Sequence, residues 1–79
     1  MREFEIRLRS VQDVHDFVDL STTKPFTILV CDDFHQVNGK SFMEMFALNF
    51  SNRLLVRSEG YDWEFEQFLQ DVQRFRVTQ

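Results

Sequence analysis

The sequence is poor in residues that interrupt regular structure, with two glycines and one proline among 79 residues. This scarcity argues against disorder and indicates helices and strands joined by short connections. A single cysteine, Cys31, excludes an internal disulfide. No apolar run approaches the roughly 20 residues that cross a bilayer, and the first residues lack the apolar segment of a signal peptide. We therefore expect a cytoplasmic protein without a membrane partner.

The net charge and the length of the chain indicate which partners and how many domains to expect. The chain has 13 acidic and 9 basic side chains, for a net charge of −4. That balance provides no basic surface for nucleic acid, so we expect no nucleic-acid partner. A chain of 79 residues suits one domain, residues 1–79, and ten phenylalanines supply the large side chains that so small a core needs.

Hydrophobic periodicity predicts the element order β-α-β-β-α-β-α. Phe4, Ile6 and Leu8 alternate with charged residues, which is typical of a strand with one buried face. Short apolar runs predict the other strands, and a polar capping residue marks each helix. The predicted strands span residues 4–8, 26–31, 34–37 and 53–58, and the predicted helix caps are Ser10, Ser41 and Asp62.

The last predicted helix carries an apolar stripe that we expect to face the core. Its members are Trp63, Phe65, Phe68, Leu69, Val72 and Phe75. Elements this short, in this order, are best combined in an α+β fold, as an antiparallel sheet with the helices on one face.

One stretch resembles a known family. Val37-Asn-Gly-Lys-Ser-Phe-Met-Glu-Met-Phe-Ala-Leu48 is similar to the HPr family, whose members typically have a Lys-Ser pair that opens a short, partly exposed apolar helix. The similarity continues through Leu54-Leu-Val-Arg-Ser-Glu-Gly60 and the acidic final helix. The resemblance implies an HPr-like open-faced sandwich, with a four-stranded antiparallel sheet and three helices on one face.

The N-terminal half departs from the family at its signature, Gly-x-His-x-Arg-Pro between the first strand and the first helix. Extending the Ser41 match backwards without gaps puts the phosphohistidine position at Ser10 and the arginine position at Gln12. His15 is nearby, but no Arg-Pro follows it and Asp13, Asp16 and Asp19 surround it in sequence, where they would repel a phosphoryl donor. We therefore expect a protein without histidine phosphotransfer, and we keep a phosphocarrier that uses the displaced His15 as an alternative.

Two features of the Ser41 helix point to regulation and docking. In many members of the family the serine that matches Ser41 is phosphorylated by a dedicated kinase, and the modified protein then binds a transcriptional regulator. Ser41 also begins a S-x-x-E capping box with Glu44, which by itself explains a serine here. Phe42, Met43 and Phe46 match positions that are often exposed and partner-binding in the family, whereas core packing is the competing explanation for apolar groups here.

Within the same helix, Met45 and Leu48 are the residues that we assign to the core. The resemblance thus implies protein partners, a kinase or a transcriptional regulator.

Other chemistry finds little support. Cys31, Asp32, Asp33 and His35 lie close in sequence, but a strand and a turn would scatter their side chains, so we predict no metal site. We also predict no cofactor and no catalytic residue, hence no enzyme. The sequence favours an HPr-like regulatory or docking protein, with Ser41 as a phosphorylation candidate. A scaffold or oligomer subunit that has kept only the fold is a further alternative, and the oligomeric state stays open.

Overall fold

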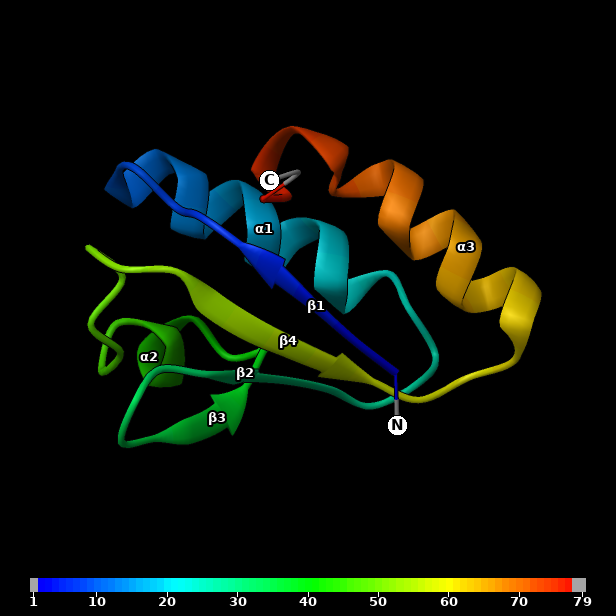
Figure 1. The fold of residues 1–79 in the computed structure, drawn as a ribbon, viewed down its shortest axis with the longest axis horizontal. Helices are drawn as coiled ribbons and strands as arrows, with labels where there is room; N and C mark the ends of the chain where they lie inside the picture. Colours follow the sequence, from blue (N-terminus) through cyan, green and yellow to red (C-terminus); the bar gives the residue numbers. More distant parts are fainter. Residues whose placement is uncertain (1, 78–79) are drawn as a thin grey trace.

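The strands and helices follow one another in the predicted order. The computed structural model describes residues 2–77, and Figure 1 shows its layers. The strands are β1 (Arg2–Ile6), β2 (Ile28–Cys31), β3 (Gln36–Asn38) and β4 (Leu54–Ser58). The helices are α1 (Val11–Thr22), α2 (Phe42–Met45) and α3 (Asp62–Asp71), and a 3-10 turn, η1, follows at Gln73–Phe75.

The four strands form one antiparallel sheet in the order β1-β4-β2-β3. Val56 of the central strand β4 pairs with Phe4 of β1 on one side and with Val30 of β2 on the other. All three side chains are buried, so this row lies on the face that the helices cover. The predicted α+β sandwich, with a four-stranded antiparallel sheet and helices on one face, is confirmed.

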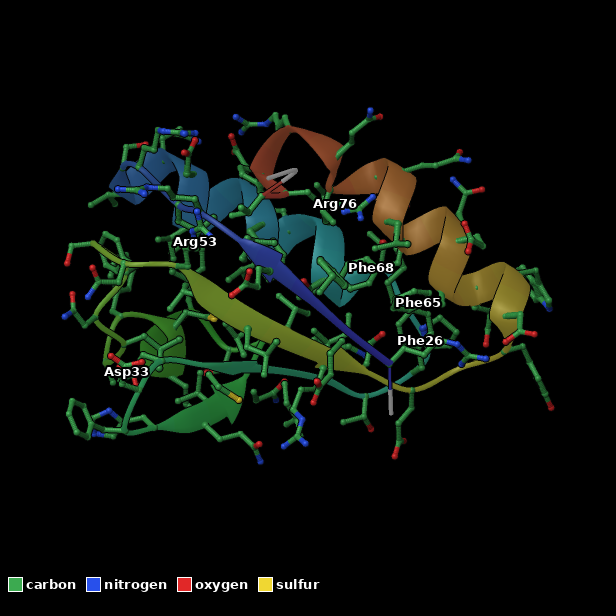
Figure 2. All side chains as sticks on the ribbon, in the orientation of Figure 1. Phe26, Asp33, Arg53, Phe65, Phe68 and Arg76 are labelled. Atoms are coloured by element: carbon green, nitrogen blue, oxygen red, sulfur yellow. The ribbon has the colours of Figure 1, made fainter. Side chains whose placement is uncertain are left out.

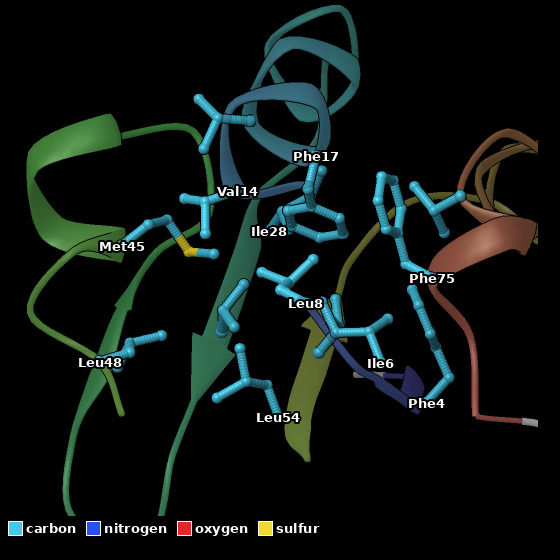
Figure 3. Packing of buried hydrophobic residues seen from close by; sticks show 14 of the residues in the cluster. Phe4, Ile6, Leu8, Val14, Phe17, Ile28, Met45, Leu48, Leu54 and Phe75 are labelled. Carbon is cyan, nitrogen blue, oxygen red and sulfur yellow. The ribbon is translucent and has the colours of Figure 1, made fainter. Parts of the chain in front are cut away.

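The core lies between the sheet and the helices, and each helix contributes to it. Figure 3 shows Val14 and Phe17 of α1, Met45 of α2 and Phe75 of η1 converging on the side chains of the strands. Several rings meet edge to face, among them Phe4 and Phe68 with ring centroids 5.6 Å apart. Such pairs add about 0.5–1.5 kcal/mol to the burial of their apolar area.

The C-terminal segment covers the edge of the sheet at β1. The Arg7 backbone N–H donates to the Phe75 carbonyl at 2.7 Å, and the Val77 N–H donates to the Glu5 carbonyl at 3.0 Å. These bonds occupy an edge that would otherwise offer unpaired backbone groups. The pairing of β1 with β4 ends at Ile6, two residues before the predicted end of the strand, although Leu8 stays buried as the alternation predicts.

The predicted helix caps are confirmed for two of the three helices. Ser10 caps α1 and Ser41 caps α2, each through its hydroxyl oxygen. The prediction that Asp62 caps α3 is wrong, because Tyr61 is the N-cap and Asp62 is the first helical residue. The N–H of Tyr61 donates to the Glu64 carboxylate at 2.8 Å, which satisfies a backbone donor at the helix start.

The apolar stripe of α3 is narrower than predicted. Phe68, Val72 and Phe75 are buried, and Phe65 and Leu69 pack partly against the core. Trp63 does not join them, because its side chain is 70% exposed. Trp63 precedes Phe68 by five positions, and at about 100° per residue this spacing turns the two side chains well apart around the helix.

Candidate functional site

The α2 helix is held at its start by Ser41 and Glu44. The Ser41 hydroxyl accepts from the Glu44 N–H at 3.3 Å, as the capping motif predicts. The Glu44 carboxylate does not close the box on Ser41: it accepts from the N–H of Asn38, the last residue of β3, at 3.1 Å. The Ser41 N–H donates instead to the Asn38 carbonyl at 3.0 Å. Glu44 therefore fixes the short helix to the end of β3.

Apolar side chains of α2 divide between the core and the surface. Met45 is buried, as is Leu48 just beyond the helix, which agrees with the predicted core residues. Met43 is 86% exposed and Phe46 is 43% exposed, whereas Phe42 is half-buried against the core. The residues predicted as partner-binding are thus on the surface or at its margin.

The aromatic rings along α2 form a continuous row. Phe42 and Phe46 stack with their ring centroids 5.4 Å apart and their planes 29° from parallel. Phe50 meets Phe46 edge-on at 6.5 Å. We call Phe42, Met43, Phe46 and Phe50 together the α2 surface.

His15 joins this row from α1. Its ring lies edge-on to Phe42 with centroids 4.6 Å apart, and its Nδ1 is 3.1 Å from an Asp19 carboxylate oxygen. Within residues 2–77 no backbone N–H donates to the ring. His15 therefore lies on a helix beside carboxylates, without the amide donors that would hold a phosphoryl group.

The β1–α1 connection flanks the other end of the α2 surface. Arg7, Leu8 and Arg9 line a shallow hollow of about 380 Å³ together with Phe50 and Ser51. Both arginines are exposed, and neither forms an ion pair with a carboxylate of the described chain. Phe50, the last ring of the row, thus lies beside the two positive charges of Arg7 and Arg9.

The start of α1, where the resemblance puts the phosphohistidine position, is occupied by capping side chains. The Ser10 hydroxyl accepts from the Asp13 N–H at 3.1 Å, and the Asp13 carboxylate accepts from the Arg9 N–H at 3.0 Å. Asp13 also pairs with Arg74, with 3.3 Å between the charged atoms. A carboxylate therefore already takes the place that an incoming anion would need at this end of α1.

Asp32 anchors the turn that lies beside the α2 surface. Its carboxylate accepts from the backbone N–H groups of Asn49, Phe34 and His35 at 2.9, 2.8 and 2.6 Å. Hydrogen bonds from the Asn49 and Phe34 amides hold the pKa of Asp32 well below its ordinary range. The His35 ring also approaches this carboxylate, at 3.3 Å. From the sequence, Cys31, Asp32, Asp33 and His35 were considered as metal ligands. Among these four residues, Asp32 and His35 have side chains in contact.

One other group of potential metal ligands is brought together among residues 2–77. His15, Asp16 and Asp19 have donor atoms within 4.8 Å of one another on α1. The Asp16 carboxylate accepts from the Gln12 amide at 2.8 Å and pairs with Arg74 at 2.6 Å, while Asp19 faces His15. These contacts account for the cluster as charge pairing on a helix surface.

Comparisons with known proteins agree with this architecture. No protein-family model matches the chain, and no curated protein sequence matches it. Among solved structures, HPr-C-His from Thermoanaerobacter tengcongensis aligns with a TM-score of 0.75 and 23% identity over 92% of each chain. A Mycoplasma histidine-containing phosphocarrier protein aligns with a TM-score of 0.73 and 15% identity, over 92% of this chain and 89% of its own.

The chain therefore has the fold of the HPr phosphocarrier proteins, as the resemblance at residues 37–48 implies. Identities this low establish the fold and leave the activity open. Within the described residues, no helix combines the length and hydrophobicity needed to span a bilayer.

Three residues at the candidate site were not singled out from the sequence: Phe50, Arg7 and Arg9. Phe50 had a usable signal, because Phe42, Phe46 and Phe50 recur every four residues. The sequence contained no such signal for Arg7 and Arg9, because both belong to the alternating pattern of the first strand. They lie beside Phe50 only in the folded protein.

Proposed function

We propose that this chain is a non-catalytic docking protein with the HPr fold, which binds protein partners through the α2 surface. The observation that carries the proposal is the exposure of Met43 and of Phe46, whose ring stacks on that of Phe42. Contiguous exposed apolar groups on a small domain typically mark an interaction site, and aromatic side chains supply much of the binding energy at such sites.

The charges beside the rings indicate what the partner carries. Arg7 and Arg9 are free of carboxylate partners in the described chain and lie next to Phe50. A partner with apolar anchors and an acidic margin would satisfy both parts of the surface. The carboxylate of Asp13 accepts from the Arg9 backbone N–H and pairs with the side chain of Arg74, and those of Glu44 and Asp32 accept from backbone N–H groups of this chain.

The absence of histidine transfer is supported by the start of α1. Ser10 falls at the phosphohistidine position when the sequence match at Ser41 is extended without gaps, and Ser10 and Asp13 accept from backbone N–H groups at this helix end. Incubation with the general components of the phosphotransferase system, followed by detection of acid-labile phosphate, tests this part. We expect no label. Acid-labile phosphate on His15 would instead establish the phosphocarrier alternative.

Affinity capture from the native cell tests the docking part. The tagged chain is compared with Met43→Lys and with Gln70→Lys, which adds the same charge at an exposed position of α3. We expect Met43→Lys to reduce recovery of a specific protein on the order of tenfold, because it puts a charge among the rings. The Gln70→Lys chain should capture as much of that protein as the parent chain does. Equal capture by the parent chain and both variants would contradict docking at α2.

We further propose Ser41 as the position at which this surface is switched. Ser41 is half-buried and directly precedes Phe42, so a phosphate there would add close to two negative charges beside the rings. For a partner with an acidic margin the expected effect is weaker binding. Mass spectrometry of the protein from its native cell tests the modification, and an unmodified Ser41 under all growth conditions would leave docking without a switch.

A second copy of the chain is the remaining alternative occupant, which would make the protein a scaffold or oligomer subunit. Sedimentation of the parent chain and of Met43→Lys distinguishes it. Stable self-association that Met43→Lys abolishes would assign the α2 surface to self-assembly rather than to a partner.

A further inference from the structure

Another exposed aromatic residue, Trp63, belongs to the first turn of α3, which begins at the other end of the molecule from α2 (Figure 1). Trp63 is 70% exposed. A hollow of about 180 Å³ separates the first turns of α3 from the connection between α1 and β2. Its apolar lining comes from Pro25, Phe26 and Trp63, and its polar lining from Thr23, Lys24, Glu64 and Gln67. We call this the Trp63 hollow.

The surroundings of the Trp63 hollow are acidic. Residues 58–73 contain no lysine, arginine or histidine. The carboxylates of this stretch are Glu59, Asp62, Glu64, Glu66 and Asp71. Arg2 pairs with Asp62, and Lys24 pairs with Asp71. Within residues 2–77 neither Glu59 nor Glu66 has an ion-pair partner.

The nearest cations of the chain are themselves engaged. The Lys24 ammonium is partly buried against Asp71, and the Lys40 ammonium donates to the Lys24 carbonyl at 2.6 Å. Arg2 donates to the Gly60 carbonyl at 3.0 Å and lies over the Phe65 ring, 5.6 Å from its centroid. Glu66 does not itself line the hollow, but it follows Trp63 by three residues, so the two side chains occupy neighbouring positions on the α3 surface.

We propose that the Trp63 hollow binds a basic segment of a protein partner, with a lysine or arginine side chain over the Trp63 indole and its charge toward Glu66. Indole is the aromatic face that cations favour most. The aliphatic stem of the same side chain would pack on Pro25 and Phe26, as long cationic side chains commonly do on apolar surface.

Size and charge favour this occupant over others. The hollow is smaller than the roughly 300–1,000 Å³ of small-molecule sites, and it suits one long side chain. The carboxylates of residues 58–73 around it would repel an acidic peptide or a nucleic acid. The preference is opposite to that of the α2 surface, which has two free arginines beside it, so the two ends of the molecule would bind different partners.

Fluorescence provides the test, because Trp63 is the one tryptophan of the chain. The probe is a hexa-arginine peptide, titrated at low salt into the intact protein, with a hexa-glutamate peptide as the control. We expect a saturable change in Trp63 emission with hexa-arginine and none with hexa-glutamate. An emission that hexa-arginine leaves unchanged would overturn the proposal.

Two charge-matched variants separate a local site from the net charge of the protein. Glu66→Gln removes a carboxylate beside Trp63, whereas Asp33→Asn removes one at the opposite end of the molecule, as Figure 2 shows for Asp33 and Phe26. We expect Glu66→Gln to weaken hexa-arginine binding on the order of fivefold and Asp33→Asn to change it little. Equal weakening by both variants would show attraction to net charge only and would overturn the proposal.

Calorimetric titration of Trp63→Leu gives a readout that does not need the indole. We expect loss of most of the hexa-arginine binding, with the melting temperature nearly unchanged because Trp63 is exposed. Undiminished binding would again overturn the proposal. Met43→Lys, which tests the α2 surface, should leave hexa-arginine binding unaltered, so the two proposals fail separately.

Discussion

The carboxylate of Asp32 accepts a hydrogen bond from the backbone N–H of Asn49, with 2.9 Å between the two atoms. This bond joins the β2–β3 turn to the segment that follows α2, directly before Phe50. The same carboxylate accepts from two amides within its own turn. One side chain thus organises the turn and fixes the end of the α2 surface at which the rings meet Arg7 and Arg9.

We expect Asp32→Asn to destabilise the protein more than Asp33→Asn, since Asp33 is exposed and makes none of these bonds. The pKa of Asp32 is lowered in the folded protein by the Asn49 and Phe34 amides. Its contribution to stability is therefore complete above the ordinary carboxyl pKa of about 3.9 and is lost as the pH falls toward the lower folded value.

Urea unfolding of the Asp32→Asn, Asp33→Asn and parent proteins at several pH values measures this effect. The gap between the parent and Asp32→Asn should be constant near neutrality and should narrow below about pH 4. A gap that widens as the pH falls would contradict the assignment.

Phe68 is the centre of the aromatic core. It is fully buried, and its ring lies 5.6 Å from Phe4, 5.8 Å from Phe26 and 6.3 Å from Phe17. Phe68→Ala should lower the free energy of unfolding by about 3–5 kcal/mol, because it leaves a cavity among these rings. Phe34→Ala, at a ring that is 87% exposed, should change it by no more than about 0.5 kcal/mol.

Chemical denaturation measures both values, and Phe68→Leu offers a milder variant should Phe68→Ala fail to fold. Losses of the same size at positions 68 and 34 would show that the core is not organised around Phe68.

The hydroxyl of Ser10 has a capping role that substitution can isolate. Ser10→Ala should cost about 0.5–2 kcal/mol of stability, since it removes the acceptor for the Asp13 N–H. Ser10→Gly should cost only a few tenths of a kcal/mol, because glycine is itself tolerated at an N-cap. Thermal unfolding by circular dichroism provides the comparison, and an alanine variant as stable as the glycine variant would argue against the cap.

The thiol of Cys31 should react slowly in the folded protein. Burial raises the pKa of Cys31, and the nearby Arg57 charge only partly opposes this rise. A raised pKa leaves less thiolate at a given pH, and the thiolate is the reactive form. Alkylation by iodoacetamide at pH 8 should therefore be several-fold slower for the native chain than for the chain in urea. Equal rates would show that Cys31 is not shielded.

Much of the fold follows from local patterns in the sequence. The alternation around Phe4 and Ile6 predicts β1, and Ser10 and Ser41 mark two helix starts, because these signals depend only on neighbouring residues. Met45 and Leu48 were also assigned correctly to the core. Trp63 was assigned wrongly to the core-facing stripe, because periodicity alone does not show which apolar residues of a wide stripe reach the sheet.

The candidate site was predictable only in part. The resemblance identifies Phe42, Met43 and Phe46, and the structure puts Met43 and Phe46 on the surface. Phe50, Arg7 and Arg9 reach this site through the chain fold, because β1 ends beside the segment that follows α2. Glu44 was expected to bond Ser41 and instead bonds Asn38, a choice that depends on how β3 approaches the helix.

Site-specific photo-crosslinking in the native cell tests docking at α2 most directly. A benzophenone side chain is placed at Met43 in one variant and at Gln70, an exposed position of α3, in another. Docking at α2 predicts a discrete adduct between position 43 and another protein, and position 70 should not form that adduct. The adduct should disappear when Phe46→Ser is added, because the stacked pair with Phe42 is then lost. Position 43 forming no adduct, or the same adducts from both positions, would contradict the account.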